Sequence, residues 1–292
     1  KLKLFIIIME TKKQQPNQKP RSKGVSAFLV VIGCAIVAHI FFYGVAGAGS
    51  GNFLDIFGLS TNFDEKGHPL AGNTLGTLYQ GGWVIPIVIT LLLTVLTLSV
   101  ERFFALNRAG GKGNTAKFVM NAKAKLEAGD IAGAAKLCDE QKGSVANILK
   151  AGLVRYSDVE KLTDIHNDEK AAMIQKEIEE ATTLELPYLQ QNLSVIATIS
   201  TLGTLMGLFG TVLGMIKSFG AMGQEGAPDS TALAVGISEA LMNTAMGIGT
   251  GAAAIISYSY FSGRVEDITN AVDEVGFAIG QTYTTLHGGL SK

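Results

Sequence analysis

The sequence is short of charge, of cysteine and of clustered histidine. Only 17% of its 292 residues are charged, against about 25% in an average soluble domain. The two cysteines, Cys34 and Cys138, cannot form a disulfide framework, and no group of cysteines and histidines has the spacing of a metal site. The formal net charge of −1 provides no basic field for nucleic acid. We therefore expect no metal, no cofactor and no nucleic-acid partner, and the scattered histidines match no catalytic arrangement of an enzyme.

Charge is missing above all from four long apolar windows, which are 25–47, 84–100, 192–216 and 232–261. Together these windows contain one charged residue, Glu239. Each is as long as the roughly 17 to 25 residues that a helix needs to cross a bilayer. They are continuously apolar and lack the alternation of a membrane β-strand. The sequence therefore predicts an all-α membrane protein with four transmembrane helices.

The positions of Lys and Arg predict the topology, because these residues near spans stay on the cytoplasmic side. Residues 1–24 carry seven Lys and Arg and one acidic residue, whereas 48–83 carries Lys66 as its only basic residue. We therefore predict a cytoplasmic N-terminal segment and a loop at 48–83 on the other, periplasmic side of the membrane. The remaining predicted segments are a cytoplasmic helical domain at 101–191, a transmembrane helix at 192–217, a short periplasmic loop at 218–231 and a cytoplasmic helical tail at 262–292.

Two features near the N-terminus leave alternatives open. The chain starts at Lys1, and the apolar run after it is too short to span, so residues 1–8 could precede a true start at Met9. The first span could also be a signal peptide cleaved near Ala46 to Ala48. Its apolar run of about 20 residues exceeds the 7 to 15 of such peptides. We therefore expect this span to be retained.

Capping residues at regular intervals predict a helical bundle in the segment 101–191. Ser, Thr, Asn and Asp are typical of helix starts, and glycine is typical of helix ends. The predicted starts are Asn114 or Thr115, Asp130 and Ser144, and the predicted ends are Gly129 and Gly143.

The last two spans are predicted to continue beyond the membrane as long rods. From Asp168 the helical pattern runs into the third span, and Pro187 should kink this helix rather than end it. The fourth span likewise continues through Arg264 toward Tyr283.

Small residues recur in these two spans at intervals of three and four, which keeps them on one helical face. Such a face lets another helix approach closely. We interpret it as a helix-packing or pore face, formed by Gly203, Gly207, Gly210 and Gly214 in the third span and by Gly236, Ala240 and Gly247 in the fourth.

Polar residues accompany the small ones. A carboxylate within a span costs about 2.5 to 3.5 kcal/mol and is by default a functional hypothesis. We predict that Glu239 either faces an ion path or pairs with Lys217. The hydroxyls of the third span could instead bond to carbonyls of their own helix. The predicted polar positions are Thr201, Thr204 and Thr211 in the third span and Glu239, Asn243 and Thr244 in the fourth.

Two motifs of these spans resemble the MotA/TolQ/ExbB family of energy-transducing proton-channel subunits. They are GLFGTVLGM at 207–215 and GISEALMNTAMG at 236–247, and the resemblance covers roughly residues 80–280. It is greatest to ExbB. The resemblance implies a homopentamer whose last two spans line a central pore. It also implies an ExbD-like single-span partner with an intramembrane aspartate that takes up and releases the proton, the transported ion.

Carried over residue by residue, Glu239 and Thr244 match the pore glutamate and pore threonine of the family. The sequence departs from the family where a Thr-x-Pro precedes the first motif, because Leu202, Gly203 and Thr204 stand there. Thr201 or Thr204 could supply the missing hydroxyl.

The resemblance implies a motor subunit of the bacterial inner membrane that passes energy through an ExbD-like protein to a TonB-like protein. A TolQ-like role, a gliding or flagellar stator role, and a membrane scaffold that moves no ion remain as alternatives.

Overall fold

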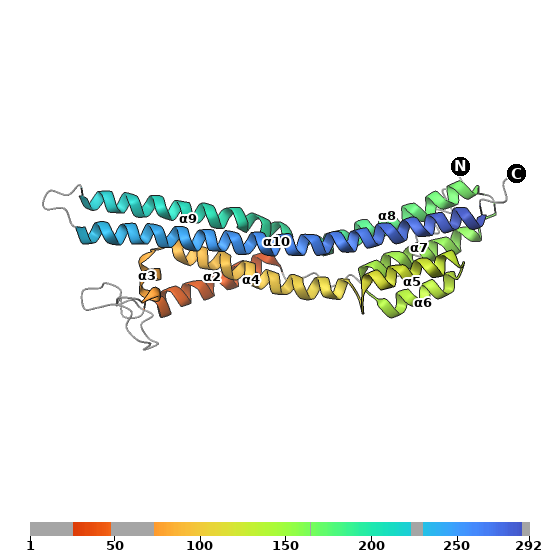
Figure 1. Cartoon of the computed structure of the whole chain (residues 1–292), viewed down its shortest axis with the longest axis horizontal. Helices are drawn as coiled ribbons and strands as arrows, with labels where there is room; N and C mark the ends of the chain where they lie inside the picture. Colours follow the sequence, from red (N-terminus) through yellow and green to blue (C-terminus); the bar gives the residue numbers. More distant parts are fainter. Residues whose placement is uncertain (1–25, 48–72, 164, 223–229, 288–292) are drawn as a thin grey trace.

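The protein is an elongated assembly of helices, described by a computed structural model over residues 26–47, 73–163, 165–222 and 230–287 (Figure 1). The predicted segment 1–24, the alternative start at Met9, most of the loop 48–83, the tip of the loop 218–231 and the residues after 287 lie outside the described residues. The elements are α2 (Ala27–Ile40), the π-helix η2 (Phe41–Ala46), α3 (Thr74–Gln80), α4 (Val84–Ala109), α5 (Thr115–Glu127), α6 (Ile131–Gln141), α7 (Ser144–Glu160), α8 (Asn167–Gln190), α9 (Leu193–Met222) and α10 (Ser230–His287).

Within the described part of the chain, four helical stretches are long and apolar enough to cross a membrane, which confirms the predicted fold class. They cover 27–46, 84–109, 167–220 and 233–287. In what we call the span half, α9 lies alongside the first half of α10, and α2 packs against α4 (Figure 1). Which end of each helix faces the cytoplasm stays a prediction.

The predicted loop before the second span ends in a short helix, α3. The side chain of Asn73 caps it, because Oδ1 accepts hydrogen bonds from the amides of Leu75 at 3.0 Å and Gly76 at 3.2 Å. Gly81 and Gly82 then form a turn into α4, and the φ of +70° at Gly82 is one that glycine adopts without strain.

The predicted continuous rod from Asp168 into the third span is wrong. The helix α8 ends at Gln190, α9 begins at Leu193, and Asn192 between them has a φ of +62°. Pro187 lies in the last turn of α8, where its ring and its missing N–H weaken the helix. The helix ends about one turn after Pro187. The proline therefore weakens the end of α8, but the helix does not end at the proline itself.

The second predicted rod is present. The helix α10 is continuous for 58 residues, from Ser230 to His287, and runs the length of the molecule (Figure 1).

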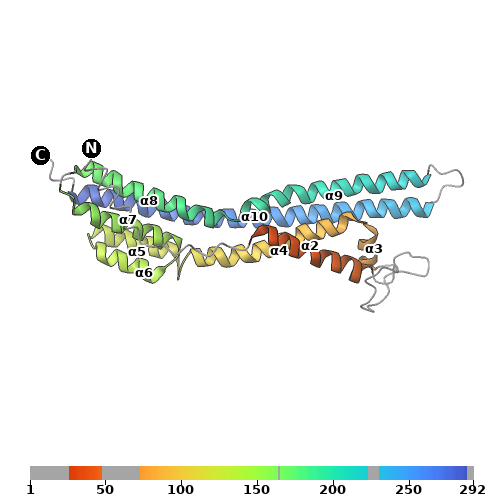
Figure 2. The same cartoon turned by 180° about the vertical axis from the view of Figure 1, so that it is seen from behind.

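In the other half of the molecule, which we call the bundle half, α7 packs against α8, α5 and α7 pack against the C-terminal part of α10, and α6 packs against α5 and α7 (Figure 2). Asn114 and Asp130 cap α5 and α6 as predicted, with side chains that accept backbone amides. Ser144 does not cap α7. Gly143, with a φ of +92°, takes the cap position, and the Ser144 hydroxyl donates to Glu185 Oε2 at 2.9 Å. This bond ties α7 to α8.

Candidate functional site

The small-residue faces of α9 and α10 pack against each other within the chain. A Cβ added to Gly207 would lie 2.9 Å from Gly247 Cα, and one added to Gly214 would lie 2.8 Å from Ala240 Cβ. The two backbones therefore touch with no space for larger side chains. All the small residues named from the sequence are buried in this α9–α10 contact, namely Gly203, Gly207, Gly210, Gly214, Gly236, Ala240 and Gly247.

Two predicted hydroxyls meet within the α9–α10 contact. Thr211 Oγ1 and Thr244 Oγ1 are in hydrogen-bond contact. Each also lies 3.2 Å from a carbonyl of its own helix, Gly207 O for Thr211 and Ala240 O for Thr244. Since each hydroxyl carries one proton, only two of these three contacts can be hydrogen bonds at once. The pair therefore has alternative hydroxyl orientations.

Asn243 lies one turn from Glu239 on α10 and is 1% exposed. Its Nδ2 donates to the carbonyl of Gly81 at 3.0 Å, which joins α10 to the turn between α3 and α4. Its Oδ1 is buried and has no hydrogen-bond partner among the residues that the structure describes. Asn243 thus faces the interior of its own chain.

Glu239 forms the ion pair that was one of its two predicted roles. Lys217 Nζ lies 2.8 Å from Glu239 Oε2. The other carboxylate oxygen, Oε1, faces the turn before α4, because a Cβ on Gly82 would lie 2.7 Å from it. Glu239, Asn243 and the two glycines of the turn therefore form one small polar region.

The remaining predicted hydroxyls lie apart from this region. Thr201 and Thr204 are exposed, and Thr204 Oγ1 donates to Ser200 O of its own helix at 3.3 Å. Thr201 is ten residues before Thr211, which corresponds to about 15 Å along a helix. The structure does not bring Thr201 to the Thr211–Thr244 pair within one chain.

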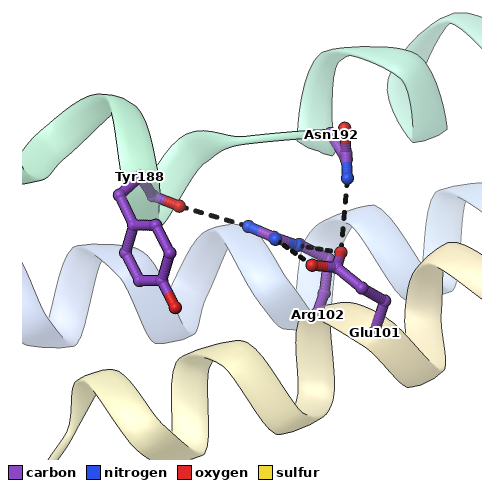
Figure 3. Close-up of polar contacts among 4 residues, drawn as sticks. All are labelled: Glu101, Arg102, Tyr188 and Asn192. Carbon is purple, nitrogen blue, oxygen red and sulfur yellow. Dashed lines mark hydrogen bonds and ion pairs between the residues drawn. The ribbon is translucent and has the colours of Figure 1, made fainter. Parts of the chain in front are cut away.

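A buried charged cluster at the junction of the two halves has no counterpart among the predicted site residues (Figure 3). The Arg102 side chain is fully buried, and its Nε and Nη2 donate to the carboxylate of Glu101. Arg102 Nη1 also donates to the carbonyl of Tyr188 at 3.2 Å, and Asn192 Nδ2 donates to Glu101 Oε2 at 3.3 Å. The sequence signal for this cluster is a pair of adjacent opposite charges, Glu101 and Arg102, directly after the second apolar window.

The region from α6 into the bundle half of α10 matches a family model. Residues 140–274 match the model of the MotA/TolQ/ExbB proton channel family. Both motifs, and with them Glu239 and Thr244, lie inside this region.

Individual relatives carry ExbB and TolQ names. A putative biopolymer transport protein ExbB-like 3 of Synechocystis is 38% identical over 29% of this chain and 41% of its own length. The Tol-Pal system protein TolQ of Pseudomonas aeruginosa is 30% identical over 42% of this chain and 53% of its own length. The biopolymer transport protein ExbB of Aquifex aeolicus is 29% identical over 41% of this chain and 72% of its own length.

The chain spans about half the length of the first two of these relatives. The similarity includes both ExbB and TolQ proteins and does not distinguish between them. Residues 140–274, which hold the packed pair of α9 and α10 and its polar side chains, are thus similar to the MotA/TolQ/ExbB proton channel family.

Proposed function

We propose that this chain is the proton-channel subunit of an inner-membrane motor that converts proton motive force into mechanical work for outer-membrane transport. The observation that carries the proposal is the set of polar contacts inside the two motif-bearing spans. These are the Lys217–Glu239 ion pair, the Asn243–Gly81 bond and the Thr211–Thr244 contact. Ionisable and polar groups at this depth are costly in a bilayer and are usually tied to transport or to a partner.

The energy source needs no covalent chemistry and no cofactor. One charge that crosses the membrane potential releases about 2.3 kcal/mol per 100 mV. Glu239 and Thr244 are five residues apart on α10, or about 7.5 Å along the axis. A proton would pass between them by way of an aspartate on an ExbD-like single-span partner, and the partner would transmit the movement to a TonB-like protein.

The surface of the span half fits an assembly of several copies. Large apolar side chains of α9 and α10 are exposed in the single chain and would face lipid or neighbouring copies. We propose a homopentamer with the N-terminus in the cytoplasm. In it, the sides of α9 and α10 left free by the glycine contact would face the axis. Exposed apolar residues on these helices include Leu205, Leu208, Val212, Ile216, Leu241 and Ile248.

The same motor could drive another output, since the partner decides what is moved. A TolQ-like role has support from relatives of that name at similar identity. A gliding or flagellar stator would use the same subunit architecture.

A scaffold that moves no ion is the second candidate, and one observation favours it. The glycine faces of α9 and α10 already pack against each other within the chain. Small residues in these spans therefore do not by themselves require a pore.

Proton flux separates the motor from the scaffold. The chain and its single-span partner are reconstituted in vesicles, and flux is driven by a potassium diffusion potential. Glu239→Gln and Thr244→Val should reduce flux at least tenfold while the complex stays assembled. Thr269→Val is the matched control, because Thr269 also bonds to its own helix, at Val265 O, but lies in the bundle half. No flux above that of empty vesicles, with the unmodified protein as with both span variants, would favour the scaffold.

A further inference from the structure

The two partners of the Lys217–Glu239 ion pair differ in their exposure. The Lys217 side chain is 65% exposed, whereas the Glu239 side chain is 12% exposed. The ammonium group therefore reaches from the surface of α9 toward a carboxylate that is enclosed on most sides. An ordinary surface ion pair would leave both partners exposed.

The position of this carboxylate is defined by a turn that requires glycine. Gly82 has a φ of +70°, and a side chain there would collide with Glu239 Oε1. Asn243 holds the same turn through its bond to Gly81 O. Among the residues that the structure describes, Lys217 is the only cationic side chain that contacts Glu239.

One carboxylate in a membrane span has room for one compensating cation. An uncompensated charge there is costly, and the Lys217 ammonium removes that cost from within the chain. If a proton or another monovalent cation bound to Glu239, it would neutralise the same negative charge, and the Lys217 ammonium would be left without a counter-charge. Lys217 can leave, because its largely exposed side chain is a flexible four-carbon stem.

We propose that Lys217 is a tethered counter-ion of Glu239. At rest the ammonium occupies the carboxylate and excludes other cations, and a transported cation reaches Glu239 only after Lys217 has moved away. Lys217 is thus a positioning residue that acts through Glu239. Its consequence for transport rests on the proposed function, whereas the shielding of the carboxylate does not.

The shielding can be measured without any transport. An apolar carbodiimide modifies protonated carboxyl groups, and mass spectrometry of the full chain in native membranes quantifies the adduct on Glu239. In Lys217→Gln no ammonium covers the Glu239 carboxyl group, so the reagent can reach it and we expect modification about tenfold faster than in the unmodified protein. Lys217→Arg keeps the charge and should stay within twofold of the unmodified rate.

The matched control is Lys176→Gln. Lys176 lies 3.9 Å from Glu180 in an exposed pair on α8, far along the chain from Glu239, and its loss should not change the modification of Glu239. Size-exclusion chromatography verifies that each variant remains assembled. Equal modification rates in the unmodified protein and in an assembled Lys217→Gln would overturn the proposal.

Proton flux in vesicles then distinguishes this proposal from the proposed function. We expect Lys217→Gln to conduct protons in the absence of the partner. The double variant Lys217→Gln/Glu239→Gln should show as little proton flux as Glu239→Gln. Faster modification of Glu239 with no flux in any protein, unmodified protein included, would uphold the counter-ion and refute the channel. Unchanged modification with normal flux in the unmodified protein would refute the counter-ion and uphold the channel.

Discussion

Arg102 Nη1 donates a hydrogen bond to the carbonyl oxygen of Tyr188 at 3.2 Å, across 86 positions of sequence. The bond joins the end of the second span to the last turn of α8, where a helix leaves carbonyls without intrahelical partners (Figure 3). The buried guanidinium also neutralises Glu101. The Arg102 side chain therefore both satisfies a carbonyl at the end of α8 and neutralises the Glu101 carboxylate.

The Arg102 cluster should be a large contributor to stability. Arg102→Leu leaves Glu101 without its counter-charge and the Tyr188 carbonyl without this donor. We expect a loss of about 3 kcal/mol in the free energy of unfolding, since breaking a buried ion pair from one side costs roughly 3 to 5. Thermal unfolding in detergent measures it. Arg108→Leu, an exposed arginine on the same helix, is the control, and equal melting temperatures for both variants would contradict the expectation.

The contact between Gly207 and Gly247 should not tolerate one methyl group. In Gly207→Ala the new Cβ would lie 2.9 Å from Gly247 Cα and 3.0 Å from Asn243 O. Both neighbours are backbone atoms, so the helices must separate, at about 1 to 3 kcal/mol for overpacking.

Gly249→Ala provides the comparison for that methyl group. A Cβ at Gly249 meets nothing within 4 Å, so this variant should be as stable as the unmodified protein or slightly more so. Unfolding by SDS in mixed micelles ranks the two variants. A Gly207→Ala protein as stable as Gly249→Ala would show that the two backbones do not touch.

Cys138 should be almost inert toward alkylating reagents in the folded protein. Burial raises the pKa of the Cys138 thiol to about 12, and the nearby Asp139 adds to the effect. The reactive thiolate is therefore scarce at pH 8, by about a thousandfold relative to an ordinary thiol, and its fraction rises tenfold with each pH unit below that pKa. The rate is measured with iodoacetamide in Cys34→Ser, which leaves one thiol. Fast labelling before denaturant is added would contradict this burial.

Single-helix features were predictable from the sequence because their causes are local. The caps at Asn114 and Asp130, and the uninterrupted run of α10, follow from side chains within a few positions of each boundary. Gly143 and Ser144 show the limit of such reasoning. The sequence predicts Gly143 as a helix end and Ser144 as the next cap, whereas Gly143 takes the cap position and the Ser144 hydroxyl donates to the carboxylate of Glu185, which is distant in sequence.

The break between α8 and α9 was not predictable from periodicity. Residues 187–192 contain no glycine, and the apolar pattern continues across them. The contacts at the break come from Glu101 and Arg102, which are distant in sequence. Tertiary contacts therefore outweigh the local helical tendency at this point.

The candidate site was predictable in its residues but not in its geometry. The sequence singled out Glu239 and offered Lys217 as a partner, because a hairpin places both near the same end of the last two spans. That Asn243 faces Gly81 depends on the fold of the turn before α4. Spacing along a helix shows which residues share a face, but it does not show which part of the structure that face contacts.

The helix α10 is uninterrupted over 58 residues, which at 1.5 Å per residue corresponds to a length of about 87 Å. The helices beside it, α8 and α9, are separated by a break at Asn192, whereas α10 has no break at that level. A rotation of α10 at the level of Glu239 would therefore also turn the residues packed around Tyr283 near its other end.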